Sequence, residues 1–279
     1  MNTVAQIRAP AVAGMFYPKD AQQLRQQVDE LLLQGEVPTR SGEVVALIVP
    51  HAGYMYSGLT AAKAFAAVRN SQFDVCVLVG PSHYEVVDGI SLYSGDAFAT
   101  PLGELSVNKA LRKEALQSSS IIFESTLGHR SREHALEVEL PFLQVLNKQC
   151  AILPITIGDQ CRANAYEFGA ALARICKNKN VLLIASSDLS HFHTSDAARM
   201  KDHVIIEHVR AMDDAQLMDA LETGRGEACG GGAIVAVLSA AKELGINECA
   251  ITHSCNSGDV TGDMESVVGY FSAVLWKKN

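Results

Sequence analysis

The sequence has no closely spaced cysteine pair, no long basic run and little proline. Its seven cysteines are scattered and none forms a C-x-x-C motif, which argues against a disulfide framework and against a structural zinc knuckle. The formal net charge is −8, and lysine and arginine are dispersed along the chain. A nucleic-acid-binding surface needs clustered basic residues, so we expect no nucleic-acid partner.

Long apolar runs are also missing. No stretch approaches the roughly 20 apolar residues that a membrane-spanning helix needs. The first residues, MNTVAQIRAPAVAG, lack the basic start and apolar stretch of a signal peptide. With 48% hydrophobic and 19% charged residues, the composition is that of an ordinary globular protein. We therefore expect a cytoplasmic protein that does not associate with membranes.

Short apolar runs alternate with helical patterns, which indicates an α/β protein. Buried strands are predicted at Val44–Val49, Val75–Val79, Ala151–Ile157 and Val181–Ala185, and closing strands at Glu248–Ser254 and Val267–Leu275. Helices are predicted at Leu59–Val68, Glu133–Leu146 with a kink or restart at Pro141, Arg162–Cys176, Ser195–Met212, Asp214–Glu222 and Gly232–Leu244. A small hairpin beside the sheet is predicted from Ile90–Tyr93 and Glu104–Val107.

These elements predict a single domain over residues 1–279, built as a three-layer α/β/α sandwich around a largely parallel, mixed sheet. Residues 1–42 would form an N-terminal arm and helix packed on that domain. A polar loop, Gln34–Gly42, would separate them from the first strong strand.

Three of the predicted strands are each followed within a few residues by a histidine. The segment VVALIVP precedes His51, VCVLVGP precedes Ser82 and His83, and VLLIAS precedes the Ser-Asp-Leu-Ser sequence that ends at His191. Ligands of open α/β sheets bind beyond the carboxyl ends of the strands. A single histidine there is most often a loop or capping residue. Three together favour one metal-binding or acid–base pocket.

Other polar residues near these strand ends have more than one interpretation. Asp188 can orient a histidine ring, act as a base or cap the following helix. His193 forms an H-x-H pair with His191, and we expect it at most to contact the pocket residues without touching the ligand. Glu133 and Glu137 would share one helix face with His134 nearby. The simplest interpretation of Glu133 and Glu137 is that they lie on a solvent-exposed helix face. The segment has only one histidine, whereas a zinc-protease helix needs two.

Cys229 opens a Cys-Gly-Gly-Gly sequence just before a predicted helix. A helix N-terminus lowers a thiol's pKa, so this residue is placed to be a thiolate. The alternative is a small buried packing residue, the usual fate of a free cysteine. No Lys-Ser or Lys-Thr follows the glycines, which excludes a phosphate-binding loop of the usual kind.

Seven segments together resemble the Memo family, named from a mediator of cell motility in animals. They are PAVAGMFYP (10–18), PHAGYMYSG (50–58), GPSH (80–83), EHALEVELPFL (133–143), SSDLSHF (186–192), CGGG (229–232) and SGDVTGD (257–263). The resemblance implies a fold similar to that of the class III extradiol dioxygenases.

The same resemblance implies an iron or copper site, with zinc as an alternative metal. His51, His83 and Cys229 would be the metal ligands. His191 with Asp188 would serve as catalytic acid–base residues or would support the ligands without binding the metal. It further implies a small-molecule or peptide ligand, and association with a radical-SAM protein in bacterial relatives. The dioxygenases use two histidines and a carboxylate. A thiol in the third position is softer, so extradiol ring cleavage is not expected here.

Three functions are compatible with these residues. The first is a non-haem, metal-dependent oxidoreductase. The second is a non-catalytic binding module that takes a peptide or small anion in the same pocket. The third is a thiol hydrolase with Cys229 as nucleophile and His191 as base. The sequence ranks them in that order.

Overall fold

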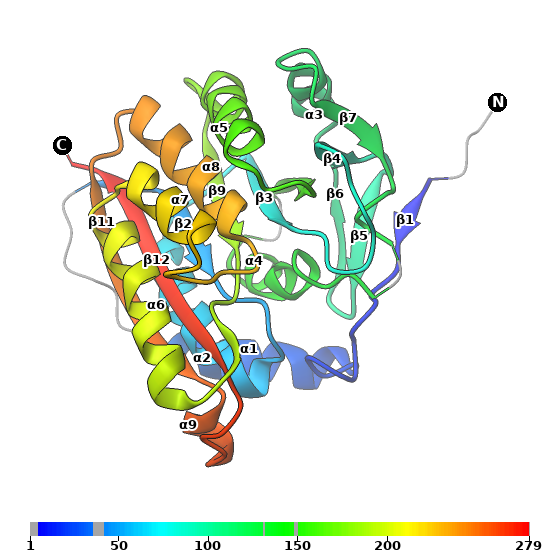
Figure 1. Ribbon diagram of the computed structural model, residues 1–279. Coiled ribbons are helices and arrows are strands. Elements are labelled where there is room, and N and C mark those ends of the chain that lie inside the picture. The colour runs from blue at the N-terminus through cyan, green and yellow to red at the C-terminus, as the bar shows by residue number, and fades with distance from the viewer. Residues whose placement is uncertain (1–4, 36–41, 131, 148–149, 279) are drawn as a thin grey trace.

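The computed structural model describes residues 5–35, 42–130, 132–147 and 150–278 (Figure 1). Its strands are β1 (Ile7–Arg8), β2 (Glu43–Val49), β3 (Val75–Pro81), β4 (Ile90–Tyr93), β5 (Ala97–Thr100), β6 (Gly103–Ser106), β7 (Ile122–Ser125), β8 (Ala151–Ile157), β9 (Val181–Ser186), β10 (His191–His193), β11 (Glu248–Asn256) and β12 (Val267–Lys277). Its α-helices are α1 (Ala21–Leu33), α2 (Tyr54–Phe65), α3 (Lys109–Leu116), α4 (Leu140–Leu146), α5 (Arg162–Cys176), α6 (Ser195–Arg210), α7 (Asp214–Glu222), α8 (Gly231–Glu243) and α9 (Gly258–Thr261). No helix in these ranges is long and apolar enough to cross a membrane.

The main sheet is mixed, as the sequence predicts. Its order is β10-β12-β2-β9-β3-β8-β4-β7, with β11 paired to β12. The central strands β2, β9, β3 and β8 are parallel to one another. Antiparallel pairs flank this centre, because β12 runs against β2 and β4 runs against β8. The carboxyl ends of β2, β9 and β3 therefore lie side by side.

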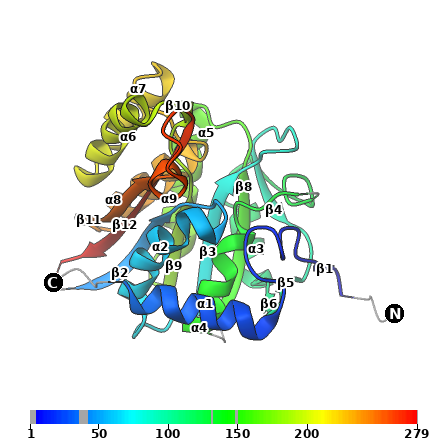
Figure 2. The ribbon, with the colours of Figure 1, turned by 90° about the horizontal axis from the view of Figure 1, so that it is seen from below.

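Helices cover both faces of the sheet and give the expected three layers. Figure 2 shows α1, α2 and α4 on one side of the sheet and α6, α7 and α8 on the other. Alternate residues of one strand serve the two cores: Ala46 and Ile48 face the layer of α5 and α8, while Leu47 and Val49 face α1, α2 and α4. Continuous apolar runs are typical of central parallel strands buried in this way.

The predicted hairpin of Ile90–Tyr93 and Glu104–Val107 is wrong. Every residue of β4 is buried, and this strand joins the main sheet between β8 and β7. The second segment forms β6, which is mostly exposed and pairs with β5 in a separate sheet of order β1-β5-β6. A strand that is buried on both faces needs neighbours within the main sheet. The four residues Ile90–Tyr93 are too few for their sequence pattern to show that both faces of the strand are buried.

The helix predicted over Glu133–Leu146 begins later than expected. Residues 133–136 are not helical, a 3₁₀ turn spans Glu137–Glu139, and α4 follows with Pro141 in its first turn. The restart at Pro141 is therefore confirmed. The carboxylate of Glu133 accepts hydrogen bonds from the backbone N–H groups of His134 and Ala135. Such local bonds compete with helix formation.

The N-terminal segment contacts the small sheet and two helices that cover the main sheet. β1 pairs in parallel with β5, and α1 packs against α2 and α4. The polar loop predicted over Gln34–Gly42 lies, for residues 36–41, outside the described residues. The turn-forming segment from Ser257 to Asp263 contains α9 and links β11 to β12.

Candidate metal centre

Four sequence-predicted residues meet at the carboxyl edge of the central strands. His51 follows β2, His83 follows β3, and Asp188 follows β9. Cys229 arrives from the turn before α8, where its backbone N–H donates to the Asp188 carbonyl oxygen (3.1 Å). The strand order β2-β9-β3 explains the convergence, because it places the three strand ends next to one another.

The donor atoms of His51, His83 and Cys229 form a compact group. All three lie within 4.8 Å of one another, and the Cys229 sulfur lies 3.2 Å from Nε2 of His51. The two imidazole rings are 5.1 Å apart and nearly perpendicular. Ligand atoms around a tetrahedral metal ion are separated by about 3.5 Å, given metal–ligand bonds of about 2.0–2.3 Å. Two imidazoles and one thiolate thus fit a transition metal in both spacing and donor chemistry.

The protonation of the His51 ring follows from its neighbours. Nδ1 of His51 lies 2.9 Å from the hydroxyl oxygen of Ser186. That hydroxyl donates its single hydrogen to the carbonyl oxygen of Ala135 (2.6 Å), so it accepts from His51. Burial of the ring and the nearby His83 lower the pKa of His51 well below its usual value. The neutral ring therefore directs an unprotonated Nε2 towards Cys229.

His83 is oriented by a carboxylate. Nδ1 of His83 lies 3.0 Å from Oε1 of Glu133, and its backbone N–H donates to Oε2 (2.7 Å). Burial alone would raise the pKa of Glu133, but the hydrogen bonds and charge of His83 outweigh it and hold the pKa at about 2. An ionised carboxylate only accepts hydrogen bonds, so Nδ1 of His83 is the donor and Nε2 is the ring nitrogen left for a metal ion.

Asp188 and His191 have separate partners. The carboxylate of Asp188 accepts from the backbone N–H of His51 (2.8 Å), so it fixes the loop that carries this histidine. Burial raises the pKa of Asp188 to about 7. His191 points Nδ1 at the carbonyl oxygen of Leu189 (2.8 Å), and burial lowers the pKa of its ring. His191 thus presents a neutral, unprotonated Nε2.

The expected thiolate at Cys229 is wrong for the metal-free protein. Burial raises the pKa of this thiol well above its usual value, and the neighbouring Asp188 raises it further. Cys229 also precedes the helix, since α8 begins at Gly231. The S–H group donates instead to the unprotonated Nε2 of His51. Metal binding would have to displace this proton.

The segment from Glu133 to Glu137 received too little weight in the sequence-based prediction. Glu133 and Glu137, expected on a solvated helix face, are buried at 5% and 1% exposure, and Glu133 contacts the pocket whereas Glu137 contacts the N-terminal segment. His134 stacks on His83 with ring centroids 5.1 Å apart, and its Nδ1 lies 3.2 Å from the Arg132 carbonyl oxygen. The apolar residues that alternate with the charged ones in the EHALEVE segment were the sequence feature that could have indicated this burial. His193 lies further out, where Nε2 meets Glu227 (2.8 Å).

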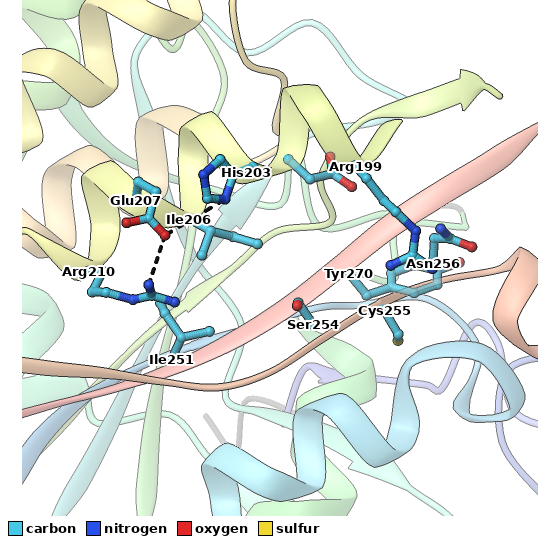
Figure 3. A pocket seen from close by; sticks show the side chains of 11 residues that line it. Arg199, His203, Ile206, Glu207, Arg210, Ile251, Ser254, Cys255, Asn256 and Tyr270 are labelled. Atoms are coloured by element: carbon cyan, nitrogen blue, oxygen red, sulfur yellow. Dashed lines mark ion pairs between the residues drawn. The ribbon is translucent and has the colours of Figure 1, made fainter. Parts of the chain in front are cut away.

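Two cavities lie near these elements. One of about 390 Å³ is lined by Cys229, by His191 and by residues of α7 and α8, but not by His51 or His83. The other, of about 290 Å³, lies between α6 and β11 and holds none of the pocket histidines (Figure 3). Its charged groups already have partners: Arg210 pairs with Glu207 (2.8 Å) and Arg199 with Asp259 (2.7 Å). The first cavity is therefore the better candidate for a ligand.

Comparison with known proteins agrees with this arrangement. The family described as Memo-like protein matches residues 8–274. The chain belongs to the Memo family. MEMO1 family proteins of Thermoplasma volcanium and Nitrosopumilus maritimus are 37% and 34% identical to it, over 98% and 95% of this chain and 99% and 98% of theirs. One from Thermotoga neapolitana is 35% identical over 96% of this chain and 99% of its own.

A solved structure shares the fold at low sequence identity. An uncharacterized protein of Escherichia coli K12 is similar with a TM-score of 0.56 and 13% identity, over 83% of this chain and 99% of that one. This likeness supports the three-layer α/β/α fold. The Memo-like segments at 50–58, 80–83, 133–143, 186–192 and 229–232 are those that supply the pocket residues described above.

Proposed function

We propose that this Memo-family protein binds a redox-active iron or copper ion through His51, His83 and Cys229 and acts in oxidation–reduction. The observation that carries the proposal is the convergence of two imidazole nitrogens and one thiol sulfur within 4.8 Å. Thiolate and imidazole ligands bind copper, iron and zinc better than they bind hard cations such as magnesium or calcium. A bound iron or copper ion would supply one-electron chemistry that side chains lack.

The surrounding residues have distinct tasks in this proposal. Asp188 holds the backbone of His51 in place through its hydrogen bond to the His51 N–H. His191 faces the cavity that also contains Cys229, and its free Nε2 can take a proton from a bound molecule or return it. Its Nδ1–H is held by Leu189, which keeps the ring in this tautomer. The ligand would be a small molecule or a peptide side chain.

Metal analysis of anaerobically purified protein tests the proposal. Wild-type protein should carry or take up stoichiometric iron or copper, and a His51→Ala, Cys229→Ala double variant should not. A His193→Ala, Cys161→Ala variant is the matched control, because His193 pairs with Glu227 and Cys161 is exposed. Equal metal content in both double variants would refute the ligand assignment. Retained zinc with no electron transfer to any oxidant would refute the redox role.

A binding module remains the second candidate, favoured by exposed aromatic residues beside the pocket histidines. Tyr84 is 51% exposed with its ring 6.3 Å from that of His83, and Phe192 is 78% exposed and 5.6 Å from His191. Phe192 also has φ of 63°, a conformation that non-glycine residues rarely adopt. Calorimetric titration of metal-stripped protein with peptides separates the candidates: full affinity without metal favours binding alone.

Thiol hydrolysis is the least supported candidate. Among the residues that the structure describes, the Cys229 thiol is hydrogen-bonded to His51 and not to His191, and burial keeps it protonated. Rapid alkylation of Cys229 by iodoacetamide at neutral pH would be needed to revive this candidate.

A further inference from the structure

The carboxylate of Glu133 is held at the centre of four hydrogen bonds. Oε1 lies 3.0 Å from Nδ1 of His83 and accepts from the backbone N–H groups of His134 (2.8 Å) and Ala135 (3.0 Å). Oε2 accepts from the backbone N–H of His83 (2.7 Å). The side chain of Glu133 is only 6% exposed. Three of the four partners are backbone donors, so both oxygen atoms act as acceptors.

This bonding decides between two readings of the cluster formed by His83, Glu133 and His134. The ligand atoms of the three residues lie within 4.8 Å of one another, which is compatible in distance with a second metal ion. The lone pairs of Glu133, however, are already directed at N–H groups, including that of His83 itself. A metal ion there would have to break bonds that fix the backbone from residue 133 to residue 135. The carboxylate therefore acts on His83 and not on an ion of its own.

We infer that Glu133 is a positioning residue, which fixes the tautomer and ring orientation of His83 so that Nε2 is presented to the metal site. The inference rests on the proposed function for the role of His83 as a ligand. The physical reason is general: a metal-binding histidine donates its other ring N–H to an oxygen acceptor, which locks the tautomer and strengthens the ligand. Removing such an acceptor typically costs 10–100-fold in metal affinity.

The direct test observes the imidazole nitrogens of metal-free protein by ¹⁵N NMR at pH 8. In the wild type, His83 should show a protonated Nδ1 and an unprotonated Nε2. In Glu133→Gln, the amide cannot accept from Nδ1–H and from the backbone N–H of His83 at once, so His83 should shift towards the Nε2–H tautomer. Glu85→Gln is the matched control, because Glu85 lies two residues after His83 but bonds Gly128 and Arg130.

Zinc(II) affinity, measured by competition with a chromophoric chelator, provides the second readout. Glu133→Gln should bind zinc(II) about 10–100-fold more weakly than the wild type, and Glu85→Gln should remain within about twofold. Glu133→Asp, which keeps the charge but shortens the side chain, should recover part of the loss.

Either of two results overturns the inference. One is a wild-type His83 that carries its proton on Nε2, which needs no variant and holds even if Glu133→Gln does not fold. The other is a Glu133→Gln protein with an unchanged tautomer and unchanged zinc(II) affinity. Failure of the proposed function is a different result: the NMR tautomer shift would be seen, but neither the wild type nor the control would bind a metal ion.

Discussion

Each pocket histidine has its Nδ1 atom hydrogen-bonded to an oxygen atom. The pairs are His51 with Ser186, His83 with Glu133, His134 with Arg132, and His191 with Leu189. In all four rings Nδ1 is thereby the donor nitrogen. The acceptors for the two proposed metal ligands are 135 and 50 residues away in the sequence. The sequence could predict the histidines from their positions after strands, but not these partners, which depend on tertiary contacts.

Asp188 gives a pH-dependent prediction for the metal-free protein. Burial raises its pKa from 3.8 to about 7, so between these values the folded state keeps a proton that the unfolded state releases. The contribution of Asp188 to stability is greatest below pH 4 and falls as the pH rises to 7, by up to about 4 kcal/mol. Asp188→Asn cannot lose a proton, so it should gain stability relative to the wild type over this range.

Urea unfolding at pH 4, 5.5 and 8 measures this effect. Asp29→Asn, at an exposed position of α1, is the control and should keep a constant difference from the wild type. A constant difference between Asp188→Asn and the wild type across the same pH values would contradict the assigned environment of Asp188.

Glu137 anchors the N-terminal segment. Its buried carboxylate accepts from Arg8 (2.7 Å), from the Tyr17 hydroxyl (2.6 Å) and from the backbone N–H groups of Ala11 and Val12. Replacing it with Gln leaves the buried Arg8 guanidinium without a counter-charge, which typically costs about 3–5 kcal/mol. Glu137→Gln should lower the free energy of unfolding by that amount in urea titrations. Exposed Glu30→Gln should change it by less than about 0.5 kcal/mol, and equal effects would refute the anchoring role.

At the scale of elements, sequence patterns predicted regular segments better than irregular ones. α5, α7 and β8 have the predicted bounds, and α2 with its 3₁₀ continuation ends at Val68 as expected. α2 begins at Tyr54 rather than Leu59, so it includes the segment Tyr54–Gly58, which precedes the predicted apolar run. Residues 133–136 were predicted to be helical but are not, because the Glu133 carboxylate accepts hydrogen bonds from the backbone N–H groups of this segment.

The start of α8 sets the position of Cys229. A Cβ atom at Gly230 would lie 2.4 Å from the Ser186 carbonyl oxygen, so Gly230→Ala must separate β9 from the turn that carries Cys229. Overpacking of this kind costs about 1–3 kcal/mol. We expect Gly230→Ala to weaken zinc(II) binding at least about tenfold, because misplacing one ligand of three removes most of the chelate.

Gly53→Ala is the matched control in the same measurement. A Cβ atom there would make ordinary contacts of 3.5 Å or more with Phe16, and the backbone φ of −58° suits alanine. Its zinc(II) affinity should equal that of the wild type. Equal affinity in the Gly230→Ala protein would show that the approach of β9 to α8 does not control the site.

For the whole molecule, alternating apolar strands and helices were sufficient to predict the three layers and the mixed sheet. The same pattern predicted that histidines after different strands would meet, because parallel neighbours share one carboxyl edge. It could not predict which residue would complete the site, since Cys229 arrives from a turn rather than a strand end. The separate β1-β5-β6 sheet was missed for a related reason, because its strands are too short to show a period.

X-ray absorption spectroscopy of the metal-loaded protein tests the central claim most directly. Loaded with zinc(II), the wild type should show one sulfur neighbour at about 2.3 Å and imidazole nitrogens at about 2.0–2.1 Å. The sulfur contribution should vanish in Cys229→Ser and persist in Cys161→Ser, whose thiol is exposed and lies outside the pocket. A coordination shell of nitrogen and oxygen atoms alone in the wild type would contradict the proposed metal centre.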